Sequence, residues 1–294
     1  MKLKIALVTS LLLLPLGALR AIDYAYETAE PQKTGWPLSQ EETDYVMKPE
    51  YGRRPGSEQQ KHLPPMWPVV PSAGSFGGTS WLDTHANLVA TVENNKGPID
   101  VLLVGDSITM QWGAAWKKNF PDLTAVNIGI GGDKTQNVLW RLDHGGVDGL
   151  EPRLIILMIG NNNMFFTPET GIEPAALGIK ACVDNLREKF PKADVVVTDI
   201  LPAGAPENRF YEDIKLTNDA VGVLNLESDP KVHVLKLWSD FVNADGTLKA
   251  ELFGPDHIHL NQAGGYELYA SKLRPLVEKI LSGKNEKTAE KKQK

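Results

Sequence analysis

The sequence predicts an α/β fold in which helices cover both faces of a parallel β-sheet. Two observations lead to this class. Five short apolar runs rich in branched residues follow one another along the chain, and helical patterns separate them. Polar, glycine-containing motifs follow several of these runs, as is typical where the strands of an open α/β sheet end. Strands that alternate with helices favour parallel pairing, because parallel strands need long crossover connections.

The five apolar runs are the predicted strands. Each combines Val, Ile and Leu in a short stretch bounded by polar or turn-forming residues, which is typical of a strand buried on both faces. In chain order they occupy residues 100–106, 123–129, 153–160, 194–201 and 231–237. In the last run His233 alternates with Val and Leu, so we expect a histidine satisfied within the strand.

Apolar residues recur at helical spacing between the strands and at both ends of this region. The segment WLDTHANLVATVEN, residues 81–94, is the first predicted helix. The further predicted helices occupy residues 109–119, 134–143, 173–190, 208–225 and 262–281.

The first residues have the features of a secretory signal peptide. Lys2 and Lys4 precede the apolar run IALVTSLLLLPLGAL, and small residues follow it. Arg20 interrupts the run before it reaches the roughly 20 residues that a membrane span needs. We therefore expect a signal peptide at residues 1–21, a secreted or periplasmic protein, and no stable membrane span after cleavage.

Two further segments differ in composition from the predicted sheet region. Residues 22–80 are rich in Pro, Gly, Trp and charge, and they are interpreted as an irregular extension. In this extension Trp36 and Trp67 either anchor a loop to the core or bind a sugar. The last residues, 283–294, read GKNEKTAEKKQK and predict a solvated, disordered tail.

Length, charge and cysteine content narrow the class of protein. The 294 residues suffice for one large domain with a core that needs no disulfides. Removal of the predicted signal peptide changes the formal net charge from −6 to −9. Such an acidic chain is unsuited to nucleic acid, whose phosphates require clustered Lys and Arg. The single Cys182 excludes an intramolecular disulfide and is interpreted as a small buried hydrophobe.

Polar motifs follow four of the predicted strands. They are Gly105-Asp106-Ser107, NIGIGGDKTQ at 127–136, IGNNNMF at 159–165 and GPDHIHLNQAGG at 254–265. Because the carboxyl ends of parallel strands share one edge of the sheet, we expect these four motifs to converge there.

Together the motifs contain the groups that acyl transfer needs. A serine such as Ser107 is a poor nucleophile until a base takes its proton, and an imidazole titrates near neutral pH. Asp256 lies three residues before His259, close enough for its carboxylate to orient the ring. Gly132 and Asn162 supply a backbone and a side-chain N–H donor of the kind that stabilises an oxyanion.

This order of Ser, Gly, Asn and Asp-x-x-His resembles the SGNH (GDSL-type) hydrolases. The wording NIGIGGDKTQNVLWRL and MIGNNN most resembles the catalytic subunits of platelet-activating-factor acetylhydrolase. The resemblance defines a hydrolase domain at residues 81–282. It implies a flavodoxin-like three-layer α/β/α sandwich with a five-stranded parallel sheet, and ester hydrolysis through an acyl-enzyme without metal or other cofactor.

The resemblance also implies a role for each residue. Ser107 would be the nucleophile and would donate its own N–H to the oxyanion. Gly132 and Asn162 would complete the oxyanion hole, His259 would be the base, and Asp256 would orient it. Two departures are visible: Ile108 replaces a leucine, and Asn161 stands where relatives often have a smaller or hydroxyl residue, which leaves Asn161 as an alternative to Asn162.

Simpler structural interpretations exist for the same residues. Gly131 and Gly132 suit a tight turn, Asp133 suits a helix N-cap, and residues 161–163 suit a cap or Asx turns. His257, beside His259, is interpreted as a loop residue.

A different enzyme class uses similar motifs in the same order. Binuclear metallophosphoesterases need Asp-x-His, Gly-Asp, Gly-Asn-His and His-x-His. The chain has Asp83-Thr84-His85, Gly105-Asp106, Gly160-Asn161-Asn162 and His257-Ile258-His259. Against this reading, the first pair lies in a helical pattern and the third motif lacks its histidine. A non-catalytic carbohydrate-binding protein is the third possibility, although the complete Ser, His and Asp set disfavours it.

The sequence therefore predicts an exported serine esterase for short acyl groups, acetyl above all. The expected substrate is O-acetylated carbohydrate, a polysaccharide ester, and the alternative is a small lipid ester cleaved by an acetylhydrolase or lysophospholipase. The oligomeric state is left open.

Overall fold

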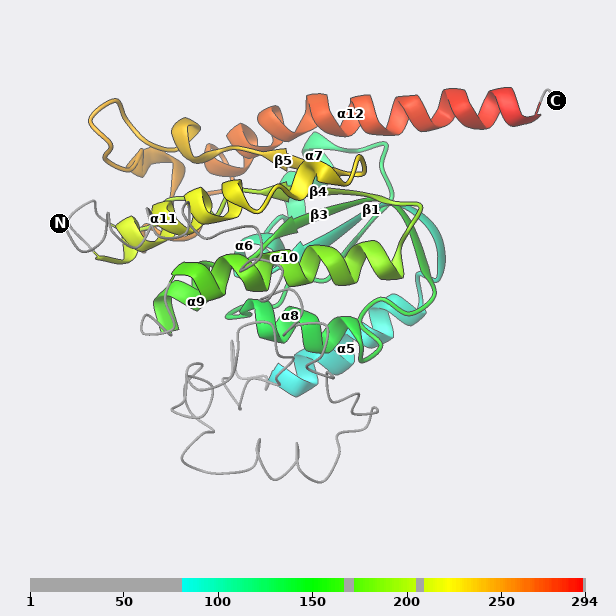
Figure 1. Ribbon diagram of the computed structural model, residues 1–294, viewed down its shortest axis with the longest axis horizontal. Helices are drawn as coiled ribbons and strands as arrows, with labels where there is room; N and C mark the ends of the chain where they lie inside the picture. The colour runs from blue at the N-terminus through cyan, green and yellow to red at the C-terminus, as the bar shows by residue number, and fades with distance from the viewer. Residues whose placement is uncertain (1–80, 167–171, 205–208, 293–294) are drawn as a thin grey trace.

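The structure, a computed structural model, describes residues 81–166, 172–204 and 209–292 (Figure 1). The predicted signal peptide at 1–21 and the predicted extension at 22–80 lie outside these residues. No helix among the described residues combines the length and the apolar character needed to cross a membrane.

One five-stranded parallel sheet forms the centre of the fold. Its strands are β1 (Gly97–Gly105), β2 (Ala125–Asn127), β3 (Leu150–Met158), β4 (Asp194–Thr198) and β5 (Val232–Leu235). They lie in the order β2-β1-β3-β4-β5, and every neighbouring pair is parallel. This is the flavodoxin-like strand order, as predicted.

The two central strands, β1 and β3, show why the strands of this protein have continuous apolar sequences. β1 and β3 pair over their whole length, with Leu103 opposite Ile156 and Gly105 opposite Met158. Both strands are covered on both faces, so successive residues are buried instead of alternating with polar ones. The carboxyl ends of the two strands are thereby fixed side by side.

Helices cover the two faces and make a three-layer sandwich (Figure 1). One core contains side chains from α5 (Trp81–Glu93), α8 (Thr135–Leu142), α10 (Ile172–Lys189) and α11 (Arg209–Val223). The other core contains side chains from α6 (Ser107–Met110), α7 (Gly113–Asn119) and α12 (Gly265–Lys292). The short elements α9 (Asn161–Phe166), η2 (Leu226–Ser228), η3 (Trp238–Asp240) and η4 (Ala250–Leu252) complete the described chain.

Two predicted helices differ in the structure. The helix expected at 109–119 begins earlier, at Ser107, and is divided into α6 and α7 by a turn that brings Gly113 to a φ of 32°. The tail expected to be disordered at 283–294 is helical as far as Lys292, where α12 ends. Its Lys, Glu and Ala residues are strong helix formers, which explains how the helix continues beyond the apolar pattern.

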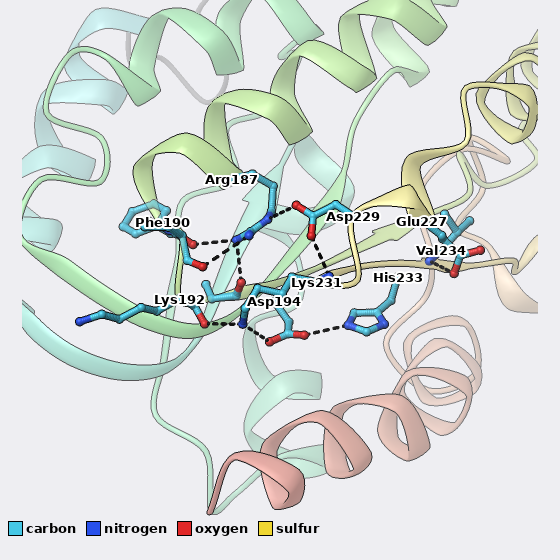
Figure 2. A network of polar contacts seen from close by, with 11 residues as sticks. Arg187, Phe190, Lys192, Asp194, Glu227, Asp229, Lys231, His233 and Val234 are labelled. Carbon is cyan, nitrogen blue, oxygen red and sulfur yellow. Dashed lines mark hydrogen bonds and ion pairs between the residues drawn. The ribbon is translucent and has the colours of Figure 1, made fainter. Parts of the chain in front are cut away.

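Cys182 and His233 have the environments that the sequence predicts for them. Cys182 is fully buried in the core, and burial raises the pKa of its thiol. His233 in β5 contacts the Asp194 carboxylate at the start of β4, with Nε2 and Oδ1 2.9 Å apart (Figure 2).

The same polar network continues across the amino end of the sheet (Figure 2). Lys231 Nζ also contacts Asp194, at 3.3 Å, and Arg187 Nε lies 2.8 Å from Asp229 Oδ2. This network stands at the opposite end of the strands from the four polar motifs, and it joins α10, β4 and β5.

Candidate active site

The nucleophile candidate stands where β1 passes into α6. Gly105 ends the strand, and the Asp106 carboxylate caps the helix by accepting the N–H of Ile108 at 3.0 Å. Ser107 is therefore the first helical residue, and it is half-buried. A Cβ on Gly105 would lie 2.1 Å from Thr109 Oγ1 and 2.2 Å from Met158 O. Only glycine fits between strand and helix at this position.

The histidine and the second carboxylate come from the loop before α12. Asp256 Oδ1 accepts the backbone N–H groups of Ile258 and His259, each at 3.0 Å. This turn places His257 in the left-handed region, at a φ of 55°, and its backbone carbonyl accepts the N–H of Gly204. The side chain of His257 is exposed, in keeping with the loop role predicted for it.

The structure brings Ser107, His259 and Asp256 into one hydrogen-bonded chain. His259 Nε2 lies 2.8 Å from Ser107 Oγ, and its Nδ1 lies 2.6 Å from Asp256 Oδ2. Partial burial opposes ionisation of Asp256, but the hydrogen bonds from His259 and Ile258 hold its pKa below the ordinary value. The carboxylate is thus kept ionised and directed at the ring nitrogen that faces away from the serine.

Two further loops supply the predicted oxyanion donors. Gly132 follows β2 with a φ of 81°, a backbone conformation that favours glycine. Within the described residues, no hydrogen bond occupies the N–H of Gly132 or of Ser107. Asn162 in α9 is half-buried, and its Nδ2 donates to the backbone carbonyl of Asp133 at 2.9 Å.

The other two asparagines of the motif are placed differently. Asn161 is buried, and its Oδ1 has no partner among the described residues. Asn163 is buried and fully engaged: Oδ1 accepts the N–H of Thr135, and Nδ2 donates to Thr135 and Gln136. Asn162 is therefore the one of the three that is bonded to the residue directly after Gly132, whereas Asn163 is bonded to the first turn of α8.

The chain around the catalytic histidine also holds the serine helix in place. Tyr266, in the first turn of α12, donates its hydroxyl to Ile108 O at 2.6 Å. Gln262 donates to Gln111 O at 2.8 Å. From the other side, Asn127 at the end of β2 donates to Thr109 O at 2.7 Å. These contacts fix the distance between the segments that carry Ser107 and His259.

A buried charged cluster lies directly behind these loops, and the sequence did not reveal it. Asp133, expected as a possible N-cap, is not one: Lys134 caps α8, and the Asp133 carboxylate points into the protein. There Asp133 Oδ2 lies 2.6 Å from Arg141 Nε, and Oδ1 accepts Trp81 Nε1 at 2.7 Å. Burial raises the pKa of Asp133 to about 6, while Arg141 and Trp81 oppose the shift. The one sequence signal was that Arg141 stands among the apolar residues Trp140 and Leu142 of a predicted helix.

Asp106 adds a second buried carboxyl to this cluster. It is fully buried, and its Oδ2 has no hydrogen-bond partner among the described residues. Burial raises its pKa to about 7, the hydrogen bond from Ile108 opposes the shift, and the nearby Asp133 carboxylate adds to it.

Of the histidines in the rival metal-site interpretation, His85 is engaged elsewhere. His85 lies in α5, buried, with its Nε2 2.8 Å from His144 O and its ring stacked on Trp81. Burial lowers the pKa of His85 to about 4. Across the described ranges, no three His, Cys, Asp or Glu side chains are grouped as metal ligands would be.

A parallel α/β sheet with Ser107, His259 and Asp256 joined at its carboxyl edge defines an ester hydrolase of the three-layer sandwich class. The chain belongs to the GDSL-like lipase/acylhydrolase family, whose sequence profile matches residues 103–266. The protein is thus a carboxylic ester hydrolase.

Individual relatives agree with this assignment. Platelet-activating factor acetylhydrolase IB subunit alpha1 from Homo sapiens is 35% identical over 211 residues, covering 70% of this chain and 86% of the relative. Subunit alpha2 from Rattus norvegicus is 34% identical over 220 residues, covering 74% and 90%. A GDSL-like lipase from Bacteroides thetaiotaomicron shares the fold, with a TM-score of 0.55 at 17% identity, over 66% of this chain and 97% of the other.

Proposed function

We propose that the protein is an exported serine esterase that removes short acyl groups, acetyl above all, from alcohol oxygens. The observation that carries this proposal is the hydrogen-bonded chain from Ser107 Oγ through His259 to Asp256, with distances of 2.8 and 2.6 Å. A serine in hydrogen-bond contact with an oriented imidazole is the arrangement that nucleophilic acyl transfer requires.

The reaction proceeds in two halves. His259 Nε2 takes the hydroxyl proton as Ser107 Oγ attacks the ester carbonyl carbon, and Asp256 stabilises the imidazolium that forms. The tetrahedral intermediate collapses, its C–O bond to the alcohol breaks, and His259 returns the proton to the leaving oxygen. Water then attacks the acyl-serine with His259 again as base, and the free acid and Ser107 are released.

The oxyanion of each intermediate is stabilised by three N–H donors. They are the backbone amides of Ser107 and Gly132 and the Nδ2 of Asn162. The two amides are unoccupied within the described residues, and Asn162 retains a second N–H after donating to Asp133. Donors that are held in place before the reaction lower the barrier because they need no reorganisation when the charge develops.

O-acetylated carbohydrate is the first candidate for the whole substrate. The predicted signal peptide would place the enzyme outside the cytoplasm, where acetylated polysaccharides are encountered. The second candidate is a small lipid ester such as platelet-activating factor, and it is favoured by the names of the relatives at 35% and 34% identity. Both candidates share the acetyl group and differ in the alcohol.

The test is hydrolysis of p-nitrophenyl esters from acetate to octanoate by the wild type and by Ser107→Ala. We expect a preference for acetate and loss of activity in the variant. Full activity of Ser107→Ala would contradict the assigned nucleophile. Absence of activity in both proteins would favour a binding protein. Acetate release from acetylated xylan and from platelet-activating factor, compared at equal ester concentration, then decides between the two alcohols.

A chelator provides the control for metal-dependent phosphoester chemistry. A serine esterase of this kind should retain its activity in EDTA. Loss of activity that added Zn²⁺ restores would support a metallophosphoesterase instead.

A further inference from the structure

The two loops that carry the nucleophile and the Gly132 amide leave neighbouring strands, and one buried side chain spans them. Arg141, on α8, reaches back toward the carboxyl edge of the sheet. Its Nη2 donates to the carbonyl of Gly105 at 2.9 Å, two residues before the serine. The N–H of Ile130 donates to the same carbonyl at 3.3 Å. Gly105 O is therefore the point at which both loops meet.

The same guanidinium also holds the loop after β2. Arg141 Nε lies 2.6 Å from Asp133 Oδ2, and neither side chain has any solvent exposure. A guanidinium is a planar, rigid fork, so its two bonds fix the Asp133 carboxylate relative to the Gly105 carbonyl.

Asp133 is in turn bonded to two further elements, α5 and α9. Its second carboxylate oxygen accepts Trp81 Nε1 from α5 at 2.7 Å. Its backbone carbonyl accepts Asn162 Nδ2 from α9 at 2.9 Å. Gly132 lies in the turn that the Asp133 N–H closes on the carbonyl of Ile130 at 3.2 Å, so the bonds that hold Asp133 also anchor the turn that carries the Gly132 amide.

We propose that Arg141 is a positioning residue for the oxyanion hole: it aligns the Gly132 amide and Asn162 with the Ser107 loop. The inference rests on the proposed function. This role requires no contact between Arg141 and the substrate. It acts through Asp133, and the Asp133–Arg141 pair is a geometric device as well as a buried ion pair.

The energetics of charge burial favour a role for Arg141 in alignment beyond stability. A buried ion pair contributes little net stability, because desolvation of the two charges offsets their attraction. Catalysis, in contrast, is sensitive to donor placement on the order of 0.5 Å. The Asp133–Arg141 ion pair costs free energy to bury, and it joins the two loops. Its presence is best explained by the precise placement that it gives to the oxyanion donors.

The decisive variant is Arg141→Lys, which keeps the positive charge. A lysine is a point charge on a flexible stem, so it can reach Asp133 or Gly105 O but cannot fix both. Removing the charge altogether would leave the Asp133 and Asp106 carboxyls buried without a counter-charge. A loss of activity could then come from misfolding as well as from misaligned oxyanion donors.

Arg187→Lys is the matched control. Arg187 makes the same kind of link at the opposite end of the sheet, with Nε 2.8 Å from Asp229 and Nη1 2.9 Å from the carbonyl of Ala193 (Figure 2). Substituting it disturbs a comparable network away from the four motifs.

The experiment measures kcat and KM for p-nitrophenyl acetate and the inhibition constant of an alkylboronic acid, which forms a tetrahedral adduct with an active serine. In Arg141→Lys we expect kcat to fall about 10- to 100-fold with KM little changed, because the oxyanion donors act in the transition state. Boronate affinity should fall by a similar factor. Arg187→Lys should lower thermal stability and leave all three values near those of the wild type.

A folded Arg141→Lys variant with wild-type kcat would overturn the proposal. If that variant does not fold, Trp81→Phe removes one hydrogen bond to Asp133 and leaves every charge in place; we expect a smaller fall in kcat at constant KM, and an unchanged kcat overturns the proposal equally. Ser107→Ala is measured alongside. Esterase activity that depends on Ser107 but not on Arg141 refutes the positioning role alone, whereas a wild type without esterase activity refutes the proposed function.

Discussion

The side-chain amide of Asn162 donates to the backbone carbonyl of Asp133 across 2.9 Å. This bond joins the loop after β3 to the loop after β2, and the residue it reaches follows Gly132 directly. A primary amide has two N–H groups. One of them fixes the side chain, and the other is left for the oxyanion in the mechanism proposed above.

Alanine substitution of each of the two neighbouring asparagines, Asn161 and Asn162, distinguishes their roles. In Asn162→Ala we expect kcat for p-nitrophenyl acetate to fall about 10²- to 10³-fold with little change in KM, the usual result of deleting one oxyanion donor. Asn161→Ala should change kcat far less, since Asn162, and not the buried Asn161, donates to the residue that follows Gly132. The reverse order of the two effects would transfer the donor role to Asn161.

The buried Asp106 carboxyl predicts a pH dependence of stability. Burial raises its pKa from 3.8 to about 7. Between these two values the folded protein keeps the proton and the unfolded chain has lost it. Asp106 therefore makes its full contribution to the free energy of unfolding at pH values below the pKa of the unfolded chain. This contribution decreases as the pH rises to the folded-state pKa of about 7, and above that pH the free energy of unfolding no longer changes because of Asp106.

Asp106→Asn tests this dependence. The amide oxygen can still accept the N–H of Ile108, but the group no longer titrates. We expect the free energy of unfolding, measured in urea between about pH 5 and about pH 8, to fall less steeply with pH than in the wild type. The slope is the readout, because the unpaired amide adds a cost that is the same at every pH. Parallel curves for the two proteins would show that Asp106 is already ionised in the folded state.

Position 129 has no room for a side chain, because Gly129 packs against the backbone of the helix that carries Ser107. A Cβ at this position would lie 2.4 Å from Met110 N and 2.8 Å from Asp106 O, both backbone atoms of the serine helix and its cap. Gly129→Ala must therefore displace α6, and we expect a loss of about 1–3 kcal/mol in urea unfolding together with a lower kcat.

Gly222→Ala is the control for that substitution. Gly222 is exposed in α11, and an added Cβ meets nothing within 4 Å. Alanine there should stabilise the protein by up to about 1 kcal/mol and leave kcat unchanged. Equal effects of the two alanines would remove the steric argument.

The left-handed backbone of His257 makes a fourth prediction. His257→Gly should preserve kcat, because glycine adopts a φ of 55° without strain and the replaced side chain is exposed. His257→Val should lower both stability and kcat, since a β-branched residue is strained at positive φ and would disturb the turn from Asp256 to His259. A large fall in kcat for His257→Gly would instead assign the imidazole of His257 a part in the reaction.

The sheet and its motifs were predictable because their signals are local. Buried parallel strands are continuous apolar runs, and each of the five predicted runs overlaps a strand of the sheet. The ends moved by a few residues; the second strand, expected at 123–129, is only Ala125–Asn127. The order of Ser107, Gly132, Asn162 and Asp256-x-x-His259 indicated the site because parallel topology gathers such loops at one edge.

The contacts that hold the catalytic loops in place were not predictable in the same way. The contacts of Arg141 with Asp133 and of Tyr266 with Ile108 join residues that the chain alone does not pair. α9 was not among the predicted helices, because asparagines suit turns as well as helix starts. The split between α6 and α7 depends on packing around Trp112, which is buried against Tyr266 and Tyr269.

The direction of α12 bears on how the enzyme can be handled. The helix begins at Gly265, a few residues after His259, and its 28 residues extend roughly 40 Å away from the carboxyl edge of the sheet (Figure 1). A tag, linker or solid support joined at the carboxyl terminus would thus lie far from Ser107. Immobilised through that end, the esterase would hold the edge of the sheet that carries Ser107 away from the support, and a fusion partner could be added there at a distance from the catalytic residues.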